Sequence, residues 1–109
     1  MATDAIEKLD VVKACQALGA KGLGSGIGGH VSRKSPDLDA FWINAFDRTL
    51  AEVTEEDVLL VDYDGNLLEG SREISKGFEF HPAIYQNRKD VTAIVHTHGF
   101  WGTALAGLA

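Results

Sequence analysis

This sequence lacks several features that would assign it to a secreted or membrane protein. It contains one cysteine, Cys15, so it can form no internal disulfide, which fits a reducing compartment. It contains no run of about 18 apolar residues, which excludes a membrane-spanning helix. The first residues form neither a basic nor an apolar segment, so we expect no secretory signal peptide. We therefore expect a soluble, cytoplasmic protein with no membrane partner.

Positive charge is also scarce. Lys and Arg number 10 against 16 Asp and Glu, which gives a formal net charge of −6. The basic residues are scattered, whereas a nucleic-acid-binding domain usually carries a basic stripe. We therefore expect no nucleic-acid partner and interpret the acidity as an aid to solubility. The length of 109 residues, with 45% hydrophobic and 24% charged residues, fits at most one globular domain.

Helix and strand signals both occur in the first two thirds of the chain. A helix is predicted from Thr3 or Asp4 to about Leu18, with Cys15 as a buried apolar residue. The apolar positions expected on one face of this helix are Ile6, Leu9, Val12 and Ala17. Strands are predicted at 30–33, 40–44 and 58–62, a capped helical turn at 54–57, and a hairpin return at 66–68 after the turn Asp64-Gly65.

The last third of the sequence predicts a helix, a strand and an apolar C-terminal segment. The helix should begin near 78–81, because Pro82 is tolerated only in a first turn, and Phe80, Ile84 and Tyr85 should fall on one of its faces. Residues 91–98 give the clearest strand signal in the chain. The apolar helix expected after Gly99 has no cap and no polar face, so other elements must bury it. We therefore expect residues 1–109 to be a partial domain, truncated at the C-terminus.

His96-Thr97-His98 is the most informative triplet in the sequence. Residues i and i+2 of a strand point to the same face, with Cα atoms about 6.5 Å apart, so both imidazoles can reach one metal ion. A catalytic zinc usually has three protein ligands, and the triplet supplies two. An ordinary pair of histidines at a strand end is the alternative. We treat His96 and His98 as candidate ligands of a divalent metal.

The glycine-rich segment at 22–29 is the second notable feature. Closely spaced glycines let the backbone approach a ligand, and successive N–H groups can bind an anion. The segment lacks the context of a dinucleotide-binding or P-loop motif, and a flexible connector is the alternative. His81 is expected near a helix N-terminus, where the helix dipole lowers a histidine pKa. We interpret it as a structural, hydrogen-bonding residue.

Several motifs occur in one order along the chain. They are Gly-Gly-His-Val-Ser-Arg at 28–33, Phe-Trp-Ile-Asn at 41–44, Asp-Val-Leu-Leu-Val-Asp at 57–62, Phe-His-Pro-Ala-Ile-Tyr at 80–85 and His-Thr-His at 96–98. Together they resemble the class II aldolase/adducin family, with the adducin-like branch as the closest. The resemblance covers about residues 11–109 and therefore nearly the whole chain.

The resemblance implies a fold, a cofactor and an assembly. The expected fold is an α/β one, an incomplete three-layer α/β/α domain around a mostly antiparallel central sheet, in a homo-oligomer that is usually a tetramer. The expected cofactor is a divalent metal held by three histidines, with zinc first and iron or manganese as alternatives. His96 and His98 match two of those ligands, and the third comes downstream of Ala109 in the family. His81 matches a helical histidine that is not a ligand.

The same resemblance suggests where a substrate would bind. The residues that would line the anionic end of a small-molecule substrate are Gly28, Gly29, His30, Ser75 and Lys76. Two positions depart from the sugar-phosphate aldolases: His30 replaces an Asn, and Gly77 stands where those enzymes carry an acid/base Glu. Aldol cleavage needs a group that moves a proton. The sequence therefore assigns no catalytic residue, and the departure weakens the expectation of ordinary aldolase activity.

Three hypotheses about function stay open. In the first, the lineage carries out metal-dependent lyase-like chemistry on a small hydroxy or keto compound, by aldol cleavage, decarboxylation or dehydration. In the second, the domain is a non-catalytic, adducin-like assembly module, which the missing Glu favours. In the third, the chain is an inactive fragment. The intact His-x-His pair favours the enzyme lineage.

Overall fold

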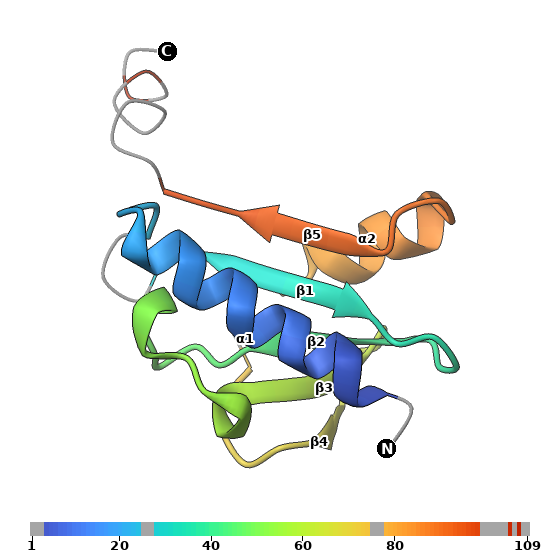
Figure 1. The fold of residues 1–109 in the computed structure, drawn as a ribbon. Helices are drawn as coiled ribbons and strands as arrows, with labels where there is room; N and C mark the ends of the chain where they lie inside the picture. The colour runs from blue at the N-terminus through green and yellow to red at the C-terminus, as the bar shows by residue number, and fades with distance from the viewer. Residues whose placement is uncertain (1–3, 25–27, 75–77, 99–104, 106, 108–109) are drawn as a thin grey trace.

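A five-stranded antiparallel sheet forms the centre of the structure, a computed structural model that describes residues 4–24, 28–74, 78–98, 105 and 107 (Figure 1). Its strands are β1 (His30–Lys34), β2 (Ala40–Asn44), β3 (Val58–Asp62), β4 (Leu67–Glu69) and β5 (Ala93–His96). They lie in the order β4-β3-β2-β1-β5, and every neighbouring pair is antiparallel. The helices are α1 (Ala5–Ala20) and α2 (Phe80–Asn87), with short 3-10 helices η2 (Leu50–Glu52) and η3 (Glu55–Asp57).

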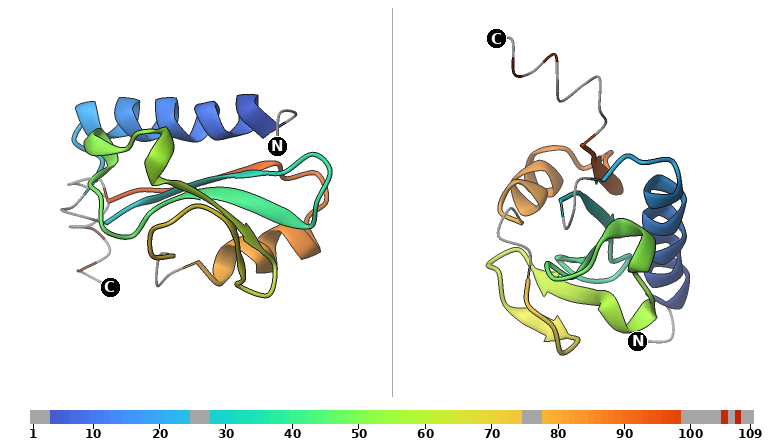
Figure 2. Two further views of the ribbon diagram at one scale, coloured as in Figure 1. Left: turned by 90° about the horizontal axis from the view of Figure 1, so that it is seen from below. Right: turned by 90° about the vertical axis from the view of Figure 1, so that its left-hand side faces the viewer.

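The two α-helices cover opposite faces of the sheet (Figure 2). Side chains of the central strand β2 therefore point alternately into two cores, and all five of its residues are buried. Trp42 belongs to the core beneath α1, whereas Phe41 and Ile43 belong to the core beneath α2. This arrangement confirms the expected α/β class and the antiparallel central sheet. In the described part of the chain, neither helix is long and apolar enough to cross a membrane.

Helix α1 buries a different face from the one predicted. Val11, Val12 and Cys15 are buried, whereas Ile6 is 70% exposed and Leu9 is 37% exposed. The expected face was therefore wrong for Ile6 and Leu9, and also for Ala17, which is exposed. Cys15 is buried as expected, and burial raises the pKa of its thiol to about 12.

Polar contacts from the sheet explain the orientation of α1. Trp42 Nε1 donates to the carboxylate of Asp4 at 3.1 Å, and Arg33 donates to Asp10 at 2.6 Å. Lys8 Nζ lies 5.4 Å from the centroid of the Trp42 ring. Asp4 holds the predicted N-cap position, but its side chain makes no capping hydrogen bond because it bonds to the sheet instead. Thr3 lies outside the described residues.

The turn at 54–57 is capped as predicted. Thr54 donates its backbone N–H and its hydroxyl to Asp57 Oδ2, at 2.9 and 3.1 Å. The Asp57 side chain, 4% exposed, also forms ion pairs with Arg72 at 2.7 Å and Arg48 at 3.3 Å. Burial alone would raise the pKa of Asp57, but the Thr54 hydrogen bonds and the two arginines hold it below its ordinary value. This cluster anchors the segment that leads into β3.

The other elements predicted within the described residues are present with small shifts at their ends, whereas the helix predicted after Gly99 falls almost wholly outside the described residues. Strands 40–44 and 58–62 match β2 and β3, the 30–33 strand extends by one residue, and the hairpin return is at 67–69. The strand predicted at 91–98 is shorter, because β5 spans only Ala93–His96. Helix α2 begins within the predicted window. It buries His81, Pro82 and Tyr85, whereas Phe80 and Ile84 are half-buried.

Candidate metal centre

All four histidines of the sequence lie together at one end of the sheet, on the side that α2 covers. The ring centroids of His30 and His96 are 5.4 Å apart, those of His96 and His98 are 5.0 Å apart, and those of His30 and His81 are 5.6 Å apart. The ring of Phe80 contacts His30, His81 and His96. The pairing of β1 with β5 creates this cluster from residues that are distant in the sequence.

The two predicted metal ligands face each other. His96 Nε2 and His98 Nε2 are 3.0 Å apart, and the rings meet nearly at right angles. Tetrahedral zinc with Zn–N of about 2.0–2.1 Å places two ligating nitrogens about 3.3 Å apart. His96 is exposed and His98 is half-buried, so a ligand can reach both. Imidazole nitrogens at this spacing fit a divalent metal of the zinc, iron or manganese kind.

The described part of the glycine-rich segment lies directly beside this pair. The backbone N–H of His98 donates to the carbonyl oxygen of Leu23 at 2.7 Å. Gly29 has φ +111, and a Cβ at this position would lie 3.0 Å from a methyl carbon of Leu50. Another residue at position 29 would therefore be strained and crowded. Residues 25–27 of the predicted segment lie outside the described residues.

Asn44 holds the junction between the glycine-rich segment and β1. Its side-chain nitrogen donates to the carbonyl oxygen of Gly29 at 3.2 Å, and its oxygen accepts from the N–H of Val31 at 2.8 Å. Asn44 is 2% exposed, so both bonds are protected from water. No role for Asn44 was predicted from the sequence. The one feature of the sequence that could have indicated a role for Asn44 is that its amide side chain directly follows the apolar run 40–43.

A buried hydrogen-bond network supports the histidine cluster from within the core. Ser32 Oγ lies 2.7 Å from His81 Nδ1 and 2.7 Å from the Tyr85 hydroxyl, and all three residues are buried. This confirms the interpretation of His81 as a structural residue. Its Nε2 has no hydrogen-bond partner among the residues that the structure describes. Burial, together with the nearby His30 and His96, lowers the pKa of His81 to about 3, so this imidazole is neutral at pH 7.

Replacing Ser32 with alanine should destabilise the domain through this network. The substitution leaves His81 Nδ1 and the Tyr85 hydroxyl buried without their shared partner, and each unsatisfied group costs about 1–3 kcal/mol. Tyr85→Phe removes only one hydroxyl and leaves the Ser32–His81 bond intact, so its loss should be smaller. Urea denaturation of both variants and the parent measures the difference. Equal stability of Ser32→Ala and the parent would contradict the network.

The structure describes only some of the other predicted site residues. His30 is half-buried; burial lowers its pKa, and His96 and His98 lower it further. Gly28 is described and half-buried. Ser75 and Lys76 lie outside the described residues, as does Gly77. Among the described residues, no three His, Cys, Asp or Glu side chains already stand in a metal-ligating arrangement.

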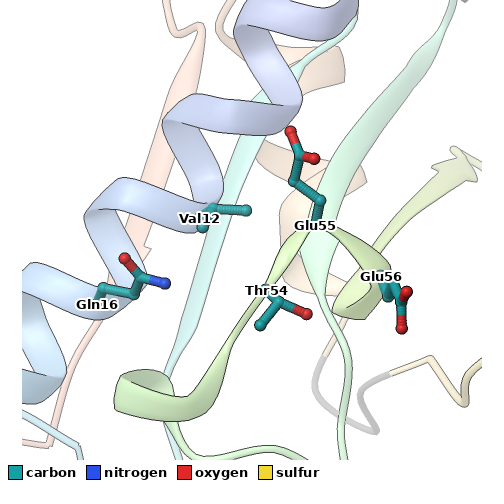
Figure 3. Close-up of a pocket in the computed structure, with 5 residues that line it drawn as sticks. All are labelled: Val12, Gln16, Thr54, Glu55 and Glu56. Atoms are coloured by element: carbon teal, nitrogen blue, oxygen red, sulfur yellow. The ribbon is translucent and has the colours of Figure 1, made fainter.

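A separate hollow lies between α1 and η3 (Figure 3). It has a volume of about 500 Å³ and is lined by Val12, Gln16, Thr54, Glu55 and Glu56. Gln16 is held there by a hydrogen bond from its side-chain nitrogen to the Val53 carbonyl oxygen. The hollow lies on the α1 side of the sheet and none of the predicted site residues line it. We therefore place the candidate site at the histidine cluster.

Comparison with known proteins identifies similar proteins that are named as aldolases. L-fuculose phosphate aldolase of Methanococcus maripaludis is 35% identical over 97 residues, covering 89% of this chain and 51% of that protein. 5-Deoxy-D-ribulose 1-phosphate aldolase of Bacillus thuringiensis is 29% identical over 102 residues, covering 94% of this chain and 48% of that protein. The solved structure of L-fuculose 1-phosphate aldolase from Glaciozyma antarctica superimposes with a TM-score of 0.88 at 31% identity, covering 95% of this chain and 44% of that one.

These relatives define the family but not the adducin-like branch. The chain spans about half the length of the curated relatives it matches. None of the three relatives above bears the name of an adducin, so the adducin-like branch stays a prediction. A family model described as the Class II Aldolase and Adducin N-terminal domain matches residues 9–109. The chain therefore belongs to the class II aldolase and adducin N-terminal domain family.

Proposed function

We propose that this domain carries the metal-binding part of a divalent-metal-dependent lyase that acts on a small hydroxy or keto compound. Zinc is the first candidate metal, and iron or manganese are alternatives. The observation that carries the proposal is the 3.0 Å separation of His96 Nε2 and His98 Nε2 at an accessible end of the sheet. When bound there, the ion would act as a Lewis acid on a carbonyl or carboxylate oxygen.

The glycine-rich segment would bind the anionic end of the substrate. Similar proteins are named as aldolases of phosphorylated sugars, which makes a phosphate or another anion the expected group. Backbone N–H groups around Gly28 and Gly29 can approach such a group closely, because no side chain intervenes. His30, Ser75 and Lys76 are the side chains that we assign to this end by family resemblance. The Asn44 hydrogen bonds to Gly29 and Val31 would keep this backbone in place.

The proposed reaction type is broader than aldol cleavage. Gly77 replaces the acid/base Glu of the sugar-phosphate aldolases, and no described residue is assigned to that role. We therefore extend the proposal to decarboxylation and dehydration besides aldol cleavage. We also propose a homo-oligomer, a tetramer by family resemblance, and a cytoplasmic location. A non-catalytic assembly module is the second candidate, and Gly77 is the observation that favours it.

Metal content separates the metal-dependent proposal from the assembly module. We expect the purified chain to hold near-stoichiometric divalent metal by mass spectrometry and to lose it on the His98→Ala substitution. Val95→Thr is the matched control, because Val95 lies on the same strand, is 54% exposed and points away from His96. It should leave the metal content unchanged. A folded parent chain without metal, after exposure to zinc, iron and manganese, would favour the assembly module.

A further inference from the structure

We propose that a hollow at the opposite end of the sheet from the histidine cluster binds a small oxyanion that carries a proton of its own, such as hydrogen phosphate. The hollow has a volume of about 260 Å³, and Glu7, Arg33, Lys34, Lys89 and Thr92 are among the residues that line it. None of these residues belongs to the proposed metal or substrate site. The inference therefore goes beyond the proposed function and does not depend on it.

The pairing of β1 with β5 determines where this hollow lies. The two strands are antiparallel, so β1 ends where β5 begins, at the end of the sheet away from the histidine cluster (Figure 1). Arg33 is paired with Ala93, three residue pairs from the pair that His30 and His96 form. Three residues of a strand span about 10 Å, so the hollow is separate from the candidate metal centre.

Three cationic side chains line the hollow, although the chain carries a formal net charge of −6. Arg33 and Lys34 come from the end of β1, and Lys89 comes from the loop between α2 and β5. Arg33 Nη1 donates to Asp10 at 2.6 Å, and Lys34 Nζ donates to the carbonyl oxygen of Ser35 at 3.1 Å. Lys89 is exposed and forms no ion pair within the described ranges. These side chains retain N–H donors that an anion can use.

Glu7 gives the hollow an acceptor besides these donors. Its Oε1 atom is buried and has no hydrogen-bond partner among the residues that the structure describes. An ionised carboxylate only accepts hydrogen bonds, and a buried acceptor without a donor is costly. Sulfate has no proton at pH 7, so it would leave this acceptor unsatisfied and repel it. Hydrogen phosphate offers an O–H donor to Glu7 and charged oxygens to the cations.

Size and charge both distinguish this hollow from the one between α1 and η3. A water molecule occupies about 30 Å³ in the liquid, so a volume of about 260 Å³ holds an ion of a few atoms together with water. The hollow between α1 and η3 is larger, at about 500 Å³, and its lining includes Glu55 and Glu56 but no cationic side chain. An oxyanion therefore fits the hollow beside Arg33 and not the larger one.

Backbone ¹H–¹⁵N spectra of the metal-free 109-residue chain, recorded during titration with inorganic phosphate at constant ionic strength, test this assignment. We expect saturable shifts of the amides of Arg33, Lys34 and Thr92. Sulfate should bind at least about tenfold more weakly, because it cannot donate to Glu7. Phosphate at the proposed substrate site would instead move the amides of 28–31, so the two sites are distinguishable. Shifts that do not saturate, or equal affinity for both ions, would overturn the proposal.

Two substitutions separate the roles of the cations and of Glu7. Lys89→Gln should weaken phosphate binding about tenfold, because it removes one charge-assisted hydrogen bond. Lys13→Gln is the matched control, because it makes the same change of charge at an exposed position of α1 outside the hollow, and it should bind phosphate like the parent.

Glu7→Gln keeps the size of the side chain but adds N–H donors, so the preference for phosphate over sulfate should fall to within about threefold. The same phosphate affinity in Lys89→Gln and Lys13→Gln would overturn the proposed site. An unchanged preference for phosphate in Glu7→Gln would overturn the role of Glu7 and with it the requirement for a protonated anion.

Discussion

Replacing Phe41 with alanine is expected to lower the free energy of unfolding by about 3–5 kcal/mol. Phe41 lies on the central strand β2 and is 0% exposed, so its removal leaves a cavity in the core beneath α2. Its ring lies 5.8 Å from those of both His81 and Tyr85, measured between centroids. The loss should therefore weaken the packing of α2 against the sheet. A loss of this size is a large part of the total free energy of unfolding of a small domain, which is about 5–15 kcal/mol.

Urea denaturation followed by circular dichroism measures this effect. Leu68→Ala is the matched control, because it also truncates an apolar side chain in a strand but Leu68 is 50% exposed. The control should change stability by no more than about 0.5 kcal/mol. Similar losses for Phe41→Ala and Leu68→Ala would contradict the position of Phe41 at the centre of the second core.

Acidification from pH 7 to pH 5 is expected to lower the free energy of unfolding by about 2 kcal/mol through His81 alone. Burial lowers the pKa of His81 to about 3 in the folded chain, whereas its ordinary value is 6.5. Above pH 6.5 the imidazole is neutral in both states. Below this pH the unfolded chain binds a proton that the folded chain excludes. Stability is therefore present above the unfolded pKa and is lost as the pH falls toward the folded pKa.

The metal-free chain in a chelating buffer is the sample for this measurement, with urea midpoints recorded between pH 7 and pH 5. His81→Gln is the comparison, because its amide can still hydrogen-bond to Ser32 but takes up no proton in this range. We expect the dependence of unfolding free energy on pH to flatten in the variant, whatever its absolute stability. The same slope in both chains would show that His81 is not buried in its neutral form.

The strands and the histidine pair were predictable from local patterns. The runs 40–44 and 58–62 are short, apolar and bounded by turn residues, and these local properties place them in buried strands. The i, i+2 spacing of His96 and His98 predicted their convergence, although β5 ends at His96 and His98 lies two residues beyond it. The capped turn at Thr54 was predictable for the same reason, because its partner Asp57 is three residues away.

Orientation and long-range pairing were not predictable in this way. Helix α1 offers apolar residues on several sides, and Trp42 and Arg33 on the sheet determine which of them is buried. The sequence alone contains no register for β1 against β5, so the contact between His30 and His96 could not be derived from spacing. The Ser32–His81–Tyr85 network could not be predicted for the same reason. Its members are distant in the sequence and meet only after the sheet and α2 have packed.

The most direct test of a metal centre at His96 and His98 is anomalous X-ray diffraction at the zinc edge, from crystals of the chain grown with zinc. We predict an anomalous peak within bonding distance, about 2.0–2.1 Å, of the Nε2 atoms of both histidines. A zinc peak elsewhere in the molecule, with these two nitrogens unliganded, would contradict the proposed metal centre.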